Sequence, residues 1–129
     1  MEFLVTKEFE FDASHFISGR GGKCERLHGH TWRFAVTLEA ELQEDGIAFD
    51  FRDLAKIVEE GVVERLDHTH LNDLLDQPSA ENLAVWIWAK LEELPLHEIR
   101  VWESGTSSVT FRGPKKGPKK GIDIGPGRI

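Results

Sequence analysis

The stretch Cys24-Glu25-Arg26-Leu27-His28-Gly29-His30 organises the chain, because a strictly alternating segment follows it. From Trp32 onward the apolar side chains occupy even positions, a pattern typical of a half-buried strand. The register carried backward places His28 and His30 on the apolar face, roughly 7 Å apart along the strand. That spacing suits two ligands of one metal ion, although two histidines beside a glycine turn are more often a capping pair or surface residues, and the motif alone indicates a metal site only about one time in three.

A third histidine lies at the end of an earlier alternating segment. Residues 3–11 carry apolar side chains at odd positions apart from Lys7, and the same register reaches Ala13 and His15. If the two strands are antiparallel neighbours, the exit of the first lies beside the entrance of the second. Three imidazoles then converge, and three histidines with an open fourth position are typical of catalytic zinc. The glycine-rich connection Ile17–Leu27 is predicted to be a loop.

The rest of the chain predicts an α+β fold. Apolar residues at spacings of three and four indicate an amphipathic helix over about 52–66. A second helix follows the N-cap residue Ser79, and two more strands are predicted over about 98–104 and 108–112. The element order is therefore ββααββ, with a four-stranded antiparallel sheet and two helices on one face. The open sheet edges favour association with further copies.

Composition and charge bound the class of protein. With 129 residues, 40% hydrophobic, and one cysteine, the chain fits one domain in a reducing compartment. The net charge of −7 divides into +4 on residues 113–129 and −11 on the rest, which argues against a nucleic-acid partner. The N-terminus lacks the basic region of a signal peptide, and no apolar run is long enough to span a membrane. We therefore expect a cytoplasmic protein without a membrane partner.

Two acidic positions leave alternatives open. Asp67 precedes His68 in a polar loop that also contains His70. A carboxylate beside a histidine commonly fixes the imidazole tautomer, but Asp67 could instead cap locally and leave both histidines exposed. Glu103 continues the apolar face of the third strand, where an unpaired carboxylate is rare. It either grips a donor-rich ligand in a pocket or lies at a frayed strand end.

Several motifs together resemble a known family. They are Phe11-Asp-Ala-Ser-His15-Phe, Cys24-x-x-x-His28-Gly-His30, Leu66-Asp67-His68, Pro78-Ser-Ala-Glu-Asn82 and Val101-Trp-Glu103-Ser. Over about residues 3–112 the chain resembles the pterin-binding T-fold (tunnelling-fold) enzymes of the 6-pyruvoyl-tetrahydropterin synthase family. The three-residue gap between Cys24 and His28 resembles the spacing in the bacterial 6-carboxy-tetrahydropterin synthase branch. The resemblance implies a single T-fold catalytic domain over residues 1–113. Residues 114–129, rich in Gly, Pro and Lys, are predicted to be a mobile tail.

The resemblance also implies roles for the polar residues. The ligands of Zn²⁺ would be His15, His28 and His30. Cys24 would be the proton-abstracting thiolate, with Asp67 and His68 as a relay pair from a neighbouring subunit. Glu103 would anchor the aminopyrimidine edge of the pterin. Ser79 stands at a position that touches the pterin, next to Ala80, where the family commonly has a second hydroxyl. Candidates for holding a triphosphate are Arg20, Lys23 and Arg26.

The activity implied by the resemblance is that of a zinc-dependent lyase. The substrate would be 7,8-dihydroneopterin triphosphate and the product 6-carboxy-5,6,7,8-tetrahydropterin, with release of acetaldehyde and triphosphate, in queuosine (7-deazaguanine) biosynthesis. The family assembles as a homohexamer, a dimer of trimers whose sheets close into barrels and whose active sites lie at subunit interfaces. Two alternatives are a 6-pyruvoyl-tetrahydropterin synthase, which keeps the side chain, and a non-catalytic pterin-binding protein. The presence of Cys24, Asp67 and His68 disfavours simple binding.

Overall fold

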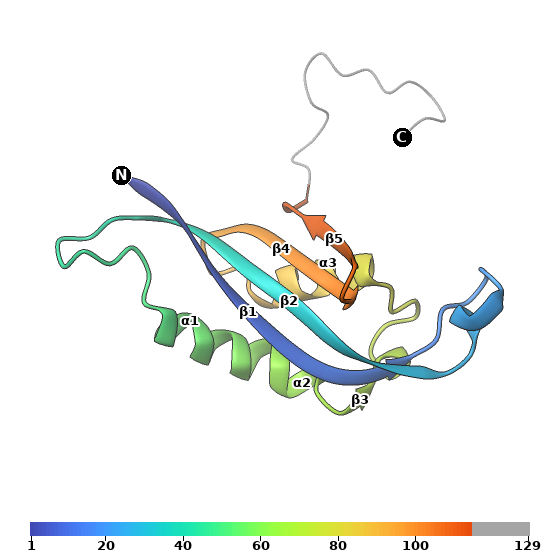
Figure 1. Ribbon diagram of the computed structural model, residues 1–129. Coiled ribbons are helices and arrows are strands. Elements are labelled where there is room, and N and C mark those ends of the chain that lie inside the picture. Colours follow the sequence, from blue (N-terminus) through green and yellow to red (C-terminus); the bar gives the residue numbers. More distant parts are fainter. Residues whose placement is uncertain (115–129) are drawn as a thin grey trace, which may run out of the picture.

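Two long antiparallel strands form the centre of the protein. The computed structural model describes residues 1–114, apart from the side chains of Lys23 and Cys24. The first two strands pair along their whole length and are followed by helices and a C-terminal hairpin (Figure 1). The strand bounds are β1 (Glu2–His15), β2 (His28–Glu41), β4 (Leu96–Ser104) and β5 (Ser107–Phe111). A 3₁₀ turn, η1 (Gly22–Glu25), lies in the connection between β1 and β2.

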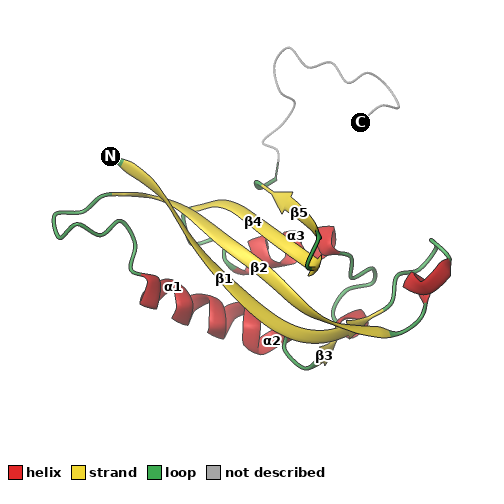
Figure 2. Cartoon of the chain, viewed as in Figure 1, coloured by secondary structure: helices red, strands yellow, loops and turns green. Residues whose placement is uncertain are grey.

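The two predicted helices are present on one face of the sheet (Figure 2). The first begins with α1 (Phe51–Val58), passes through a π-helical stretch, η2 (Glu59–Val63), and ends in α2 (Glu64–Leu66). It starts where the Asp50 side chain accepts a hydrogen bond from the backbone N–H of Arg52. The second is α3 (Ala80–Lys90), which starts after the N-cap residue Ser79.

The sheet contains one strand that the sequence did not indicate. Residues 66–73, expected to be a polar loop, contain the two-residue strand β3 (Thr69–His70) and a short 3₁₀ turn, η3 (Leu71–Asp73). β3 pairs in parallel with Ala13 and Ser14 at the end of β1. The sheet is therefore mixed and has the order β3-β1-β2-β4-β5, rather than four antiparallel strands. A strand of two residues is too short to produce a periodic pattern in the sequence.

The predicted alternation sets the core. The even-numbered side chains of β2 are fully buried at Trp32, Phe34, Val36 and Leu38. On β4, Val101, which is two residues before Glu103, is also fully buried. On β1 the odd-numbered face is buried from Val5 to His15 except at Lys7, which is partly exposed. Phe3 departs from the expected pattern, because it is 45% exposed. Among residues 1–114, no helix is long and apolar enough to cross a membrane.

Candidate metal centre

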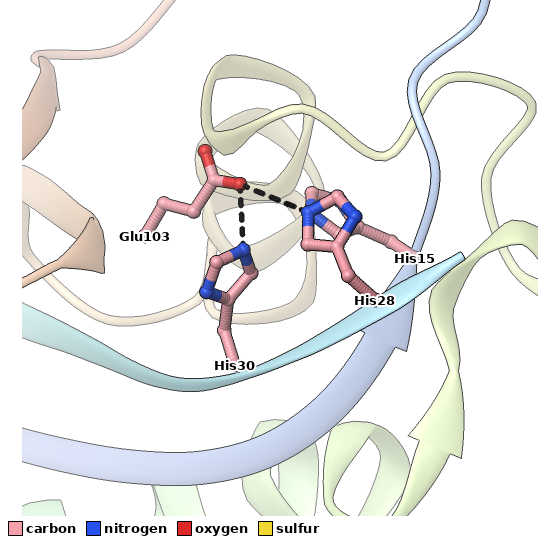
Figure 3. Close-up of side chains that lie close together, drawn as sticks. All are labelled: His15, His28, His30 and Glu103. Atoms are coloured by element: carbon pink, nitrogen blue, oxygen red, sulfur yellow. Dashed lines mark hydrogen bonds and ion pairs between the residues drawn. The ribbon is translucent and has the colours of Figure 1, made fainter. Parts of the chain in front are cut away.

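Three histidines and one carboxylate meet where the ends of three strands lie side by side (Figure 3). His15 is the last residue of β1 and pairs in register with His28, the first residue of β2. His30 is two residues further along β2 and therefore shares the face of His28. Glu103 reaches the same point from β4. The convergence expected from antiparallel pairing is thus present in the structure.

Backbone carbonyl groups fix the orientation of two of the imidazoles. His15 Nδ1 lies 2.8 Å from the carbonyl oxygen of Pro78, and His28 Nδ1 lies 2.7 Å from that of Arg26. A carbonyl oxygen only accepts hydrogen bonds, so each Nδ1 must carry the proton. In a neutral ring the Nε2 lone pair is then free. Such an outer hydrogen bond is the usual way in which a protein orients a histidine ligand toward a metal.

The free nitrogens point at one another. His15 Nε2 is 3.0 Å from His28 Nε2, and their rings pack edge to face. Two neutral imidazoles in these tautomers would bring lone pairs into repulsive contact. A proton or a metal cation between them removes that repulsion, because each nitrogen then donates its lone pair to a positive centre. The donor set therefore fits a bound metal cation.

Glu103 contacts all three imidazoles. Its Oε2 atom lies 3.0 Å from His15 Nε2, 3.1 Å from His30 Nε2 and 3.8 Å from His28 Nε2. The family resemblance predicts that Glu103 binds the substrate. The structure additionally places its carboxylate against the three candidate metal ligands. Glu103 is the penultimate residue of β4, and its side chain is 35% exposed, with Oε2 directed at the histidines. The carboxylate is therefore able to contact a metal or a ligand beside it.

The exposure of the side chain to solvent differs among the three histidines. His15 is fully buried, whereas 29% of the His28 side chain and 27% of the His30 side chain are exposed. His30 Nε2 is itself buried, and its contact with Glu103 lacks hydrogen-bond alignment. Burial lowers the pKa of His30, with the Glu103 charge opposing that shift. A lowered pKa keeps the ring neutral and available as a ligand.

Trp32 packs against two of the three histidines. Its ring packs edge to face on His15 and on His30, with centroid distances of 4.9 Å and 5.7 Å. The ring is fully buried, and its indole N–H has no hydrogen-bond partner among the described residues. Because Trp32 covers one side of the site, the site is open to solvent on the side where His28 and His30 are partly exposed.

Asp67 and His68 form a separate group with Asp12. Asp67 Oδ1 accepts a hydrogen bond from the Asp12 backbone N–H at 2.9 Å, and Asp67 Oδ2 lies 3.0 Å from His68 Nδ1. The backbone N–H of His68 donates to the Asp12 carbonyl oxygen, and His68 adopts φ 59°, an uncommon conformation for a residue with a side chain. The expected pairing of Asp67 with His68 is present, rather than a local cap.

This second group shares no residue with the three-histidine group. Asp12 and His15 have opposite parity on β1, so their side chains point to opposite faces of the sheet. The His68 side chain is 80% exposed. Within one chain, the structure therefore does not bring the predicted relay pair to the predicted metal ligands.

The remaining predicted residues have simple surroundings. The Ser79 hydroxyl accepts a hydrogen bond from the Asn82 backbone N–H at 3.1 Å and so caps α3. His70 Nδ1 lies 3.0 Å from the Ser14 hydroxyl. Arg20 and Arg26 are exposed. The side chains of Cys24 and Lys23 lie outside the described residues, although their backbone belongs to η1.

Comparisons with known proteins agree with this architecture. Residues 4–114 match the family model described as 6-pyruvoyl tetrahydropterin synthase. The chain is 38% identical over 126 residues to a 6-carboxy-5,6,7,8-tetrahydropterin synthase of Synechocystis sp., covering 90% of this chain and 98% of that relative. It is 36% identical over 114 residues to a dihydroneopterin monophosphate aldolase of Pyrococcus furiosus, covering 84% and 96%. The structure of Caenorhabditis elegans 6-pyruvoyl tetrahydropterin synthase aligns with a TM-score of 0.80 at 21% identity, over 88% of this chain and 97% of that one.

The fold and the three convergent histidines place the chain in the class of T-fold proteins with a candidate metal site. The sequence matches show the family. The chain belongs to the 6-pyruvoyl tetrahydropterin synthase family, whose members are enzymes of pterin metabolism. The family resemblance and the T-fold predicted from the motifs are thereby confirmed.

Proposed function

We propose that this protein is a zinc-dependent lyase acting on 7,8-dihydroneopterin triphosphate. With one water, the substrate gives 6-carboxy-5,6,7,8-tetrahydropterin, acetaldehyde and triphosphate, the reaction that the family resemblance implies in queuosine biosynthesis. The similarity to the Synechocystis 6-carboxy-5,6,7,8-tetrahydropterin synthase supports this choice of product. The proposal includes a cytoplasmic location and a catalytic domain over residues 1–113.

The observation that carries the proposal is the arrangement of the three histidines. Two Nδ1 atoms are held by carbonyl oxygens, and the three Nε2 atoms lie 3.0–3.8 Å from a single carboxylate oxygen, Glu103 Oε2. Zinc bound by three imidazoles with an open fourth position is the usual catalytic form. His15, His28 and His30 would hold the ion, leaving the exposed side of the site for the substrate.

The surrounding residues would perform the proton transfers. When bound, zinc would polarise the side-chain hydroxyls of the substrate and acidify the adjacent C–H bond. The Cys24 thiolate would take that proton, because a nearby cation lowers a thiol pKa. His68, held by Asp67, would return a proton to another atom of the substrate. Glu103 would accept hydrogen bonds from the aminopyrimidine edge, beside the capped start of α3 at Ser79.

A shared site follows from the separation of the two groups. Asp67 and His68 form a group separate from the three histidines of their own chain. We propose that they complete the site of a neighbouring subunit in a homohexamer made of two trimers. Closure of each trimer into a barrel would also pair the open edges of β1 and β5.

The product identifies the reaction. The zinc-loaded protein is incubated with 7,8-dihydroneopterin triphosphate, and the products are identified by mass spectrometry. A 6-carboxy-tetrahydropterin together with acetaldehyde supports the proposal. A pyruvoyl product with triphosphate would assign the chain to the branch suggested by the family description. Retro-aldol cleavage without triphosphate elimination would match the aldolase named for the Pyrococcus relative.

Mixing two inactive variants tests the shared site. Cys24→Ala and His68→Ala should each abolish turnover without releasing zinc. After the two variants are unfolded and refolded together, about one quarter of the sites should contain both wild-type residues if subunits mix at random. Recovery of that activity supports a site built from two chains. Absence of recovery, with mixed oligomers verified by mass spectrometry, would place both residues in one chain.

A further inference from the structure

The end of the sheet opposite the metal centre contains an apolar groove. It has a volume of about 560 Å³ and lies between the start of β1, the segment after β2 and the start of α1. Its lining includes Phe3, Leu4, Leu42, Ile47 and Phe51. Phe3 and Leu4 begin the strand that His15 ends, so the strand separates the groove from the metal centre by roughly 35 Å.

The lining side chains are unusually open to solvent. Phe51 is 58% exposed, Leu4 is 56% exposed and Phe3 is 45% exposed. Single exposed apolar residues are common, but large neighbouring ones around a groove indicate a surface that another segment covers.

The rim of the groove is acidic. A smaller hollow of about 260 Å³ shares Ile47, Phe49 and Asp50 with the groove and is also lined by Asp45 and Asp53. The one basic residue of the groove lining, Arg52, is paired with Asp50 at 3.1 Å. The groove therefore favours an occupant that combines apolar and basic side chains.

The register of the sheet brings the end of β5 near the end of the sheet where the groove lies. Phe111 pairs with Ile99, Ile99 with Val36 and Val36 with Lys7, so the end of β5 is three strands from β1. At about 4.8 Å per strand the separation is roughly 14 Å. β5 runs in the same direction as β2, toward the end of the sheet where the groove lies (Figure 1).

The segment from Lys115 to Ile129 has the composition that the groove requires. It contains four lysines in two pairs, followed by Ile122, Ile124 and Ile129. Residues 113–129 carry +4 against the −11 of the preceding chain. Fifteen residues span up to roughly 50 Å, which is several times the distance to the groove.

We propose that residues 115–129 occupy this groove, with isoleucines on the apolar lining and lysines against the acidic rim. The inference is independent of the catalytic proposal, because the groove contains none of the residues assigned to the reaction and the segment lies outside the family match. It assigns the basic segment to the protein's own surface, rather than to a nucleic acid or a membrane.

Limited digestion with trypsin tests the docking on the full-length protein. The segment contains four lysines and Arg128, at which trypsin cuts, and the rate of cutting at these positions reports the fraction of time for which the segment is undocked. Phe51→Ser removes an apolar group from the groove, and Val85→Ser is the matched control on α3, at a side chain that is 49% exposed. The double variant Ile122→Ser/Ile124→Ser changes only the segment and leaves the folded body intact.

The expected result is that cleavage after Lys119 and Lys120 becomes about fivefold faster or more in Phe51→Ser and in the isoleucine variant. Cleavage in Val85→Ser should match the wild type. Added salt should accelerate cleavage of the wild type, because it screens the lysines from the rim. Equal rates in all variants would overturn the proposal. A change of oligomer mass in Phe51→Ser, measured by light scattering, would also overturn it, since the groove would then be an interface between copies.

Discussion

Asn72 holds Phe16 by two hydrogen bonds, across a separation of 56 residues. The Phe16 backbone N–H donates to Asn72 Oδ1 at 2.9 Å, and Asn72 Nδ2 donates to the Phe16 carbonyl oxygen at 3.1 Å. Gln77 holds Ser18 in the same way, at 3.0 Å and 2.9 Å. These two amides fix the chain immediately after His15, where it leaves the sheet.

Asn72→Ala should weaken both the fold and the metal centre. Loss of two partly buried hydrogen bonds should lower the free energy of unfolding by about 1–3 kcal/mol. The position of His15 depends on this clamp, so metal affinity should fall by about tenfold. Denaturant titration and competition with a chelator measure the two effects. Gln43→Ala is the control, because it removes a single 3.3 Å bond in an exposed loop. Unchanged metal affinity would restrict Asn72 to a purely structural role.

Glu103→Ala should separate substrate binding from metal binding. If Glu103 anchors the pterin by charge-assisted hydrogen bonds, turnover should fall by about 100-fold or more while zinc remains bound. The structure also places its Oε2 atom 3.1 Å from His30 Nε2, so the carboxylate could instead be a metal ligand. Steady-state kinetics and metal analysis of the purified variant decide between these roles. Loss of zinc would rule out the substrate role proposed here.

Ser79 should contribute to stability and to substrate binding in ways that two variants can distinguish. Ser79→Ala should lower the free energy of unfolding by about 1 kcal/mol, because the hydrogen bond to the Asn82 N–H is lost. Ser79→Asp retains a capping oxygen and should restore stability. If the hydroxyl also contacts the pterin, Ser79→Asp should still raise KM. An aspartate variant with wild-type stability and wild-type KM would leave Ser79 with the cap alone.

Gly113→Ala should be destabilising, because a side chain has no room there. Gly113 has φ 100°, and an added Cβ would lie 2.7 Å from Trp88 Cζ2. The unfavourable backbone conformation and the contact together should cost about 1–3 kcal/mol. Gly105→Ala is the matched control, since an added Cβ meets no atom within 4 Å. Denaturant titration of both variants measures the difference, and equal stabilities would show that the chain after β5 shifts freely.

Alternation along two strands placed His15, His28 and His30 on apolar faces and so made them metal-ligand candidates. The parity of His15 relative to Phe11, and of His28 relative to Trp32, depends only on strand geometry, but their convergence also required the assumption that the two strands are antiparallel neighbours. The supporting contacts were not predictable in this way. The carbonyl groups of Pro78 and Arg26 belong to the backbone, which every residue possesses, and only the folded chain shows which carbonyl meets a ring. The hydrogen bonds between Asn72 and Phe16, and between Asp67 and Asp12, join residues far apart in sequence.

The Asp67 carboxylate should make the stability of the protein depend on pH in the acidic range. The Asp12 N–H, and then His68, lower the pKa of Asp67 below its ordinary value of 3.8. The unfolded chain therefore binds a proton at a higher pH than the folded chain does, and stability decreases as the proton concentration rises. The contribution is complete above pH 3.8 and is lost as the pH falls through the lower, folded pKa.

Asp67→Asn should remove this part of the slope when the free energy of unfolding is measured from pH 6 downward, in steps of about half a unit. Asp50→Asn is a positive control, because hydrogen bonds from Arg52 lower the pKa of Asp50 in the same direction. Parallel curves for the wild type and Asp67→Asn would mean that the hydrogen bond from Asp12 does not hold the carboxylate in solution, and the positioning of His68 would then need another explanation.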